Sequence, residues 1–305
     1  MKLYAPRYYK DFKCIADRCR HSCCVGWEID IDSDTLKKYE TLTNEYGKEI
    51  IKTVDCTDAP HFRLSSGDRC PHLDEQGLCR IITNIGEDYL CDICREYPRF
   101  YNDTAKGKAV GLGLSCEEAA RIILSSDGYT DLVLLGEING EEVKPEFDVL
   151  PYIERIYSIL SDSNLDYKEK LSGVYAVGAY SEPLINDVDA KALFMSLEYL
   201  DERNRALFAA YKSPLELSAE LEKILERALA YFVFRHLPKA SDEQELYAYL
   251  GFCLLCERLI AFLVSSGDVN DLSGFIDLAR VVSEELEYSE ENTYAVASEF
   301  YAKNI

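Results

Sequence analysis

Residues 14–27 read CIADRCRHSCCVGW and hold four of the twelve cysteines of this 305-residue chain. Six more cysteines follow up to Cys116, and only Cys253 and Cys256 lie beyond it. The chain therefore divides into a cysteine-rich front and an ordinary back. This division predicts the organisation of the whole protein.

The start of the chain predicts a reducing compartment. Residues 1–11, MKLYAPRYYKD, carry charges and aromatic rings where a secretory signal has an apolar segment, so we expect a cytoplasmic protein. Cytoplasmic thiols stay reduced, and dense cysteines there favour metal ligation over disulfides. The apolar stretch 250–265 contains Glu257 and Arg258, and we expect it to be too short and too charged to span a membrane.

The spacing of the cysteines predicts a metal centre. Four separate segments would have to converge, as in folds in which the free energy of metal binding is also free energy of folding. Iron–sulfur clusters and zinc both accept thiolates, so the spacing leaves the metal open. The clusters read Cys14-x4-Cys19-x3-Cys23-Cys24, Cys70-x8-Cys79, Cys91-x2-Cys94 and a final Cys116.

Local chemistry separates some of these cysteines. The side chains of the adjacent Cys23 and Cys24 should diverge, so they either serve two centres or one of them packs. The sequence SCEE at 115–118 is a capping box, which predicts Cys116 in the first turn of a helix reaching Ser125. Backbone N–H groups at such a position stabilise a thiolate.

Other cysteines have weaker local arguments. Cys94 is a predicted ligand, whereas Cys91 is left unassigned because the front half has no second C-x2-C pair. Cys56 stands alone and is predicted to be a half-buried small residue. Cys253 and Cys256 are three residues apart in a helical pattern, so we expect them to pack in the core.

Five short motifs in order resemble the flagellin lysine-N-methylase family over about residues 6–121. The first motif is also similar to small zinc- or iron-chelating proteins that share a CC pair. The motifs are CRHSCCVGW at 19–27, CPHL at 70–73, GLCRI at 77–81, CREYPR at 94–99 and LSC at 114–116.

The resemblance implies a bacterial enzyme that transfers a methyl group from S-adenosylmethionine to lysine ε-amino groups of flagellin, with a 4Fe–4S cluster implicated. Neither a GxGxxG turn nor the CxxxCxxC motif of radical S-adenosylmethionine enzymes is present in the sequence. The cysteines that carry over as metal ligands are Cys14, Cys19, Cys23, Cys24, Cys70, Cys79, Cys94 and Cys116.

Residues beside these cysteines are candidates for cofactor binding. Arg95 and Arg99 have guanidinium groups suited to the carboxylate of the methyl donor, or else they neutralise thiolates and surface acids after Pro98 ends a helical turn. Trp27 should pack over the metal region or stack on a substrate. His72 has a possible nitrogen ligand, although eight thiols make it unnecessary.

Three further residues are candidates for the site only because they are close in sequence to the cysteine motifs. His21 is a second possible nitrogen ligand beside the cysteines. Tyr97 and Tyr101 are near the motifs and could assist deprotonation of a lysine, but packing is the simpler interpretation. The catalytic base is therefore left unassigned.

The back half has the periodicity of amphipathic helices, with apolar residues recurring every three or four positions. Capping boxes at 213–216 and 241–244 mark two helix starts, and a short hairpin or boundary loop is expected at 129–149. The predicted helices are 150–161, 166–177, 187–211, 216–236, 243–265, 271–288 and 292–302.

The predicted fold is mainly α, with a cysteine-rich metal-binding domain at 1–128 packed on an acidic helical bundle at 129–305. The net charge of the chain is −22, and residues 121–305 hold 34 acidic and 16 basic side chains. This charge disfavours nucleic acid and favours a lysine-bearing partner such as flagellin, although it also fits a solubilising surface.

Three classes of function are compatible with these features. One is a protein-lysine methyltransferase. Another is a zinc- or iron-chelating interaction module in which the cysteines only fold the front domain. The third is an iron–sulfur electron-transfer protein.

Overall fold

The computed structural model describes residues 1–140, 145–212, 218–267, 269 and 271–301. The chain forms two compact units. Lys13–Pro98 is here called the cysteine unit, and Met1–Phe12 together with Arg99–Ile305 is called the helical unit. This division differs from the predicted boundary after residue 128, because residues 99–128 form strands and a helix that pack within the helical unit.

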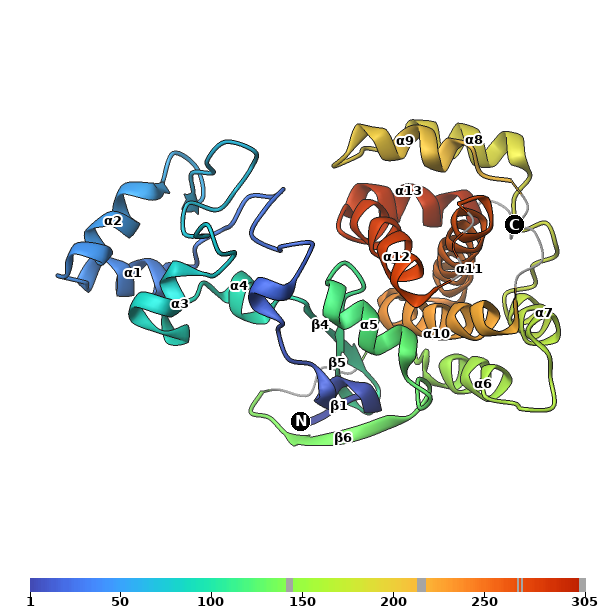
Figure 1. The fold of residues 1–305 in the computed structure, drawn as a ribbon. Helices are drawn as coiled ribbons and strands as arrows, with labels where there is room; N and C mark the ends of the chain where they lie inside the picture. Colours follow the sequence, from blue (N-terminus) through green and yellow to red (C-terminus); the bar gives the residue numbers. More distant parts are fainter. Residues whose placement is uncertain (141–144, 213–217, 268, 270, 302–305) are drawn as a thin grey trace. The chain divides into compact units, whose positions relative to one another are not determined.

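A four-stranded sheet opens the helical unit, with the strand order β4-β5-β1-β6 (Figure 1). β1 runs parallel to β5 and antiparallel to β6, so strands far apart in the sequence meet in one sheet. The predicted hairpin or boundary loop at 129–149 is thus wrong where β6 pairs with the first strand of the chain. The strands are β1 (Lys2–Pro6), β4 (Arg99–Thr104), β5 (Gly107–Leu112) and β6 (Leu132–Glu137).

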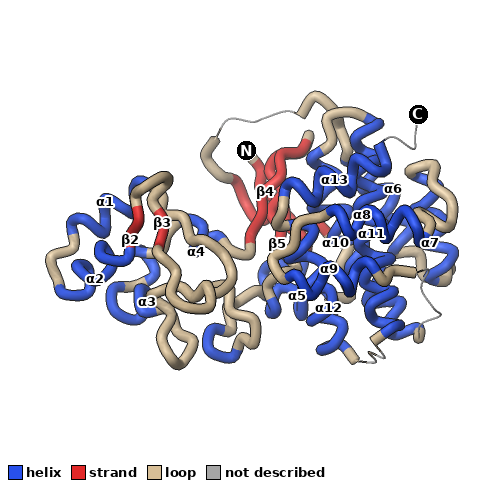
Figure 2. Tube along the Cα trace, turned by 90° about the horizontal axis from the view of Figure 1, so that it is seen from above, coloured by secondary structure: helices blue, strands red, loops and turns tan. Residues whose placement is uncertain are grey.

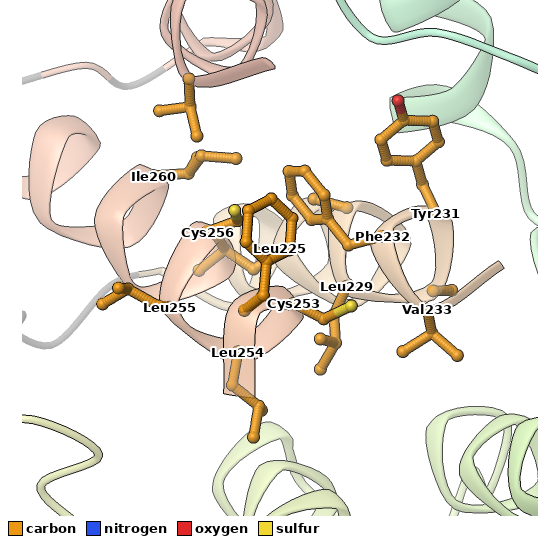
Figure 3. Close-up of a cluster of buried hydrophobic side chains, with 14 of the residues drawn as sticks. Leu225, Leu229, Tyr231, Phe232, Val233, Cys253, Leu254, Leu255, Cys256 and Ile260 are labelled. Atoms are coloured by element: carbon orange, nitrogen blue, oxygen red, sulfur yellow. The ribbon is translucent and has the colours of Figure 1, made fainter. Parts of the chain in front are cut away.

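Helices make up most of the helical unit, and the prediction of a mainly α fold is confirmed. Their buried faces meet in one hydrophobic core, part of which is drawn in Figure 3. Short 3-10 turns lie at Arg7–Asp11 and Leu237–Lys239. The helices are α5 (Glu117–Ser125), α6 (Leu150–Leu160), α7 (Tyr167–Val177), α8 (Asp187–Ser196), α9 (Glu202–Ala209), α10 (Ala219–His236), α11 (Glu243–Ser266), α12 (Leu272–Glu287) and α13 (Glu290–Tyr301).

One predicted helix is broken in two. The helix expected over 187–211 ends at Ser196 and resumes at Glu202. The backbone N–H groups of Leu200 and Asp201 donate to the carboxylate of Glu285 on α12, at 2.8 and 3.1 Å. The break is therefore compensated by hydrogen bonds from another helix, which periodicity does not reveal.

Two predicted helix starts, at Ser241 and Ser115, lie one residue before the N-caps in the structure. α11 is capped by Asp242, whose side chain accepts from the Glu245 N–H at 2.8 Å, and Ser241 instead donates to the Glu245 carboxylate. The N-cap of α5 is likewise Cys116 and not Ser115. The capping box predicted at 213–216 lies outside the described residues.

α11 is the central helix of this core. Its 24 residues, with a mean hydropathy of 1.7 over the best window, are long and apolar enough to cross a membrane, so the prediction that this stretch is too short was wrong. However, 83% of that window is buried inside the protein, as in the core helix of a globular fold. Cys253 and Cys256 are fully buried there, as predicted, and Figure 3 shows both sulfur atoms among apolar side chains.

The cysteine unit consists of short elements around its own small core, which contains Ile29, Tyr39, Ile50 and Phe62. In Figure 2 its helices are linked by long stretches of loop. Its elements are a 3-10 turn at Ala16–Arg18, α1 (Ser33–Thr41), α2 (Glu45–Thr53), β2 (Val54–Asp55), β3 (His61–Phe62), α3 (Arg80–Ile85), a 3-10 turn at Glu87–Tyr89 and α4 (Asp92–Glu96).

Candidate metal centre

Five thiols gather in the small core of the cysteine unit, and this set is here called the thiol core. Cys70 and Cys91 are 6% and 1% exposed and belong to this core, and Cys24, Cys79 and Cys94 are partly buried and pack against the same core. They come from three stretches of the chain, at Cys24, from Cys70 to Cys79 and from Cys91 to Cys94. Four of them, all except Cys91, were predicted to be ligands.

Backbone hydrogen bonds hold these stretches together. The Cys70 N–H donates to the Cys24 carbonyl at 2.8 Å, and Leu73 pairs with Cys79 in an isolated antiparallel bridge. The Arg80 N–H donates to the carbonyl of His72 at 2.7 Å. These contacts fix the positions of the cysteine backbones without any disulfide, since all twelve cysteines are free thiols.

The acidity of the thiols reflects their crowding. Burial raises the pKa of Cys70 to about 12, and the neighbouring Cys24, Cys79 and Cys91 add to this effect. The hydrogen bond between the Cys91 and Cys94 thiols lowers the pKa of Cys91 and raises that of Cys94. A hydrogen bond from the Cys23 thiol lowers the pKa of Cys24 to about 7. Several thiolates close together thus need a cation to coexist.

Cys23 and Cys24 were expected to diverge, and this expectation was wrong. Their thiols are joined by a side-chain hydrogen bond. Cys23 is exposed and Cys24 is partly buried. The pair thus connects the thiol core with the exposed loop before it.

The remaining predicted ligands lie elsewhere. Cys14 is exposed, and the Cys19 thiol donates to the carbonyl of His21 at 3.3 Å. Cys116 belongs to the helical unit, where it packs partly buried against the main core. Cys56 is exposed, which contradicts the predicted half-buried position.

The described ranges contain no preformed metal site. Within them, no three or more Cys, His, Asp or Glu side chains stand in an arrangement that would hold a metal ion. The thiol core is therefore a gathering of suitable donors and not a preformed coordination sphere.

The three residues predicted to bind a cofactor are all engaged in local contacts. The indole Nε1 of Trp27 donates to the Cys23 carbonyl at 2.6 Å, and its ring lies 6.2 Å from that of Tyr97. Trp27 therefore packs against the loop that carries Cys23, and its two predicted roles, over a metal region or on a substrate, stay predictions.

The two arginines are in different units. Arg95 forms an ion pair with Asp92 and also donates to the Leu90 carbonyl at 3.3 Å, so it fits the predicted neutralising role. Arg99 belongs to the helical unit, where its Nε donates to the Tyr9 hydroxyl at 3.0 Å. Its guanidinium lies 5.6 Å from the centre of the Phe12 ring.

His72 is a core histidine whose two ring nitrogens already have partners. Nδ1 lies 3.1 Å from the Tyr46 hydroxyl, and Nε2 lies 3.0 Å from the Thr53 hydroxyl. Burial lowers the pKa of His72 to about 4, so the ring is neutral at physiological pH. These contacts support packing over metal ligation.

Two residues of the site were not assigned from the sequence. Cys91 is the most buried thiol of the thiol core, and the C-x2-C spacing was the signal for it. The hydroxyl of Tyr39 donates to the Tyr89 carbonyl at 2.6 Å and lies 3.6 Å from the Cys91 sulfur. No pattern in the sequence singles out Tyr39 among 22 tyrosines.

The helical unit has a buried ionic network that was also not predicted. The carboxylate of Glu287 is fully buried and lies 2.6 Å from His236 Nε2 and 3.3 Å from Arg235 Nε. The Tyr231 hydroxyl donates to the same carboxylate at 2.9 Å, and it accepts from the Leu114 N–H at 3.1 Å. The network thus anchors the backbone two residues before Cys116.

The chain is similar in sequence to three known bacterial proteins. Lysine-N-methylases of Salmonella choleraesuis and Salmonella typhimurium are each 30% identical over 127 residues, which is 39% of this chain and 32% of the relative. The flagellar biosynthetic protein FliU of Salmonella muenchen is 30% identical over 139 residues, 43% of this chain and 80% of that protein.

The match therefore spans about a third of the length of the lysine-N-methylases. No family model matches the chain. No solved structure matches it either.

Proposed function

The chain belongs to the flagellin lysine-N-methylase family, and from that premise we propose that it methylates lysine side chains of flagellin or of a related flagellar protein. The proposed methyl donor is S-adenosylmethionine. Support comes from the relatives named lysine-N-methylase. It also comes from the flagellar biosynthetic protein, 80% of whose length is covered by the match.

The proposed reaction is a displacement at the methyl carbon. The neutral ε-amine of lysine forms an N–C bond as the S–C bond of the sulfonium breaks, and S-adenosylhomocysteine leaves as a neutral thioether. The proton of the attacking nitrogen passes to a base or to water. The protein must therefore keep the amine deprotonated and in line with the sulfonium.

The thiol core supports the proposal that the chain binds a metal. Five sulfur donors from three stretches share one small core, and thiolates are the ligands that iron–sulfur clusters and zinc prefer. We therefore expect Cys24, Cys70, Cys79, Cys91 and Cys94 to supply ligands. Cys14, Cys19, Cys23 and Cys116 stay predicted ligands from the family resemblance.

A bound metal would change the electrostatics of this core. A cation would hold the thiols as thiolates. Its charge would offset the cost of burying a thiolate, which is the cost that raises the pKa of Cys70. Because the thiols are gathered but do not form a coordination sphere in the described residues, we expect binding to draw them together. The proposed group is a 4Fe–4S cluster, with zinc as the alternative.

A methyl-transfer assay tests the enzymatic proposal. The full chain, isolated without oxygen, is incubated with S-adenosylmethionine labelled in the methyl group and with flagellin from the same organism. The expected result is label on lysine, identified by mass spectrometry of peptides. Flagellin whose lysines have been reductively dimethylated beforehand is the control and should take up much less label.

The opposite result has a defined meaning. If the protein carries its metal but no lysine is labelled, the methyltransferase proposal fails. The thiol core would then favour the metal-chelating module or an electron-transfer protein.

A further inference from the structure

A cavity of about 590 Å³ lies in the helical unit between the sheet and helix α6. Pockets that enclose cofactors and small ligands commonly measure about 300–1,000 Å³. All four strands, the β4–β5 turn and the residues just before β6 contribute lining residues, and so do α6 with the residue after it, α10 and the 3-10 turn that follows α10. None of the residues predicted to bind a cofactor lines it.

The lining of the cavity includes aromatic and aliphatic side chains. Tyr4, Tyr157, Phe234 and Ile153 are among its lining residues. Tyr157 is held in place because its hydroxyl donates to the Ala230 carbonyl at 3.1 Å. Aromatic and aliphatic side chains in fixed positions suit a flat, weakly polar ring system, such as a nucleobase.

Charges of both signs also line the cavity. Lys106 Nζ lies 2.6 Å from a carboxylate oxygen of Glu154, and both side chains are more than half exposed. Asp131 lines the cavity as well and pairs with Arg7 at 3.4 Å. Exposed ion pairs contribute little to stability, so they can open to a ligand at small cost. An amino-acid group, with a carboxylate and an ammonium, matches this arrangement.

We infer that this cavity binds the methyl donor, S-adenosylmethionine. The adenine ring is expected to lie against the aromatic lining, and the aminocarboxylate end against Lys106 and Glu154. This inference rests on the proposed function, because the sulfonium compound is the donor of that reaction. It assigns donor binding to the helical unit and not to Arg95 or Trp27.

Equilibrium dialysis with labelled S-adenosylmethionine tests the inference on the full chain. Ser158→Trp places a large ring at the cavity, and Lys106→Ala removes the cation. Each change should weaken binding at least tenfold. Ser125→Trp at the end of α5 and Lys37→Ala in the cysteine unit are matched controls, and both should bind as the wild type does.

Circular dichroism and thermal unfolding establish that each variant is folded. Ser158→Ala, which leaves the cavity open, should keep wild-type affinity and guards against an effect of the serine itself. If Ser158→Trp and Lys106→Ala are folded and bind with unchanged affinity, the inference is overturned.

The outcomes separate this inference from the proposed function. If the wild type labels lysine while the folded Ser158→Trp variant has an unchanged KM for the donor, the cavity assignment fails and the methyltransferase proposal stands. If the wild type binds the donor in a way that Ser158→Trp abolishes but never labels lysine, the cavity assignment stands and the enzymatic proposal fails. If the wild type binds no donor, the inference is overturned.

Discussion

Glu287 illustrates how a single buried charge is stabilised in the helical unit. Burial by itself would raise the pKa of this carboxyl, yet Arg235 and the hydrogen bond from His236 lower it to about 2. The guanidinium of Arg235 lies 4.9 Å from the ring centres of both Phe100 and Tyr288. A charge placed so deeply is tolerated only because its partners are in place.

Removing this charge should therefore be costly. Glu287→Gln leaves the Arg235 guanidinium buried without its counter-ion, and we expect a loss of about 3–5 kcal/mol in the free energy of unfolding. Urea unfolding followed by circular dichroism measures the effect. Asp201→Asn, which removes the carboxylate of the exposed Arg203 pair, is the control and should change little. Equal effects of the two changes would contradict this interpretation of the network.

His236 predicts how stability depends on pH. Burial, helped by Lys239 and Arg235, lowers the pKa of His236 from 6.5 to about 4 despite the opposing carboxylate of Glu287. The folded protein therefore holds the ring neutral, and the unfolded chain binds the proton more readily. This contribution to stability is complete above pH 6.5 and is lost as the pH falls toward 4.

The measurement is the free energy of unfolding between pH 7.5 and 4. His236→Gln should show a shallower decline than the wild type, because the titrating ring is absent. A decline of the same slope in both proteins would show that other groups cause it.

The cysteines show the limit of prediction at the residue scale. Spacing located Cys24, Cys70, Cys79 and Cys94, which the structure gathers in one core. It did not assign Cys91, because a lone C-x2-C pair is ambiguous until its burial is known. Hydrogen bonds such as that of Tyr39 depend on tertiary packing, which residue spacing does not encode.

Among the elements, helices were predicted better than strands. The back-half helices repeat apolar residues every three or four positions, and this signal is local. Strand β1 is short and finds its partners β5 and β6 more than 100 residues away in the sequence, so no local pattern marks these pairings. The gap between α8 and α9 was not predicted, because its backbone N–H groups donate to a side chain of α12 that is distant in the sequence.

Glu285 is the residue of α12 that accounts for this gap. Its carboxylate accepts from the backbone of Leu200 and Asp201 and from the Asn204 side chain. Glu285→Ala should therefore speed hydrogen exchange of the amides at 200–204, with a local loss of about 1–3 kcal/mol. Glu290→Ala, an exposed change in the first turn of α13, is the control. Unchanged exchange in Glu285→Ala would contradict this role.

For the whole molecule, the sequence predicted two parts but not their topology. The cysteine unit is inserted after β1 and its 3-10 turn, and the chain returns at β4 to complete the sheet of the helical unit. A boundary drawn from cysteine density alone cannot detect such an insertion, because the last cysteine of the front half, Cys116, lies between β5 and α5 in the helical unit. The division instead follows which residues pack together.

The insertion concentrates the candidate metal ligands in a small unit with a limited core of its own. Only nine residues form its buried hydrophobic cluster, and two of them are cysteines. Small units of this kind are commonly stabilised by a metal. We therefore expect metal binding to stabilise the cysteine unit.

The most direct test of this account is the metal content of the full chain isolated without oxygen. Iron, acid-labile sulfide and zinc are measured per chain in the wild type, in Cys70→Ser and Cys91→Ser, and in Cys253→Ala as the matched control. Bound metal is expected in the wild type and in the control, and its loss is expected in the two variants of the thiol core. A wild type that carries neither iron nor zinc and unfolds identically with and without chelator would contradict this account.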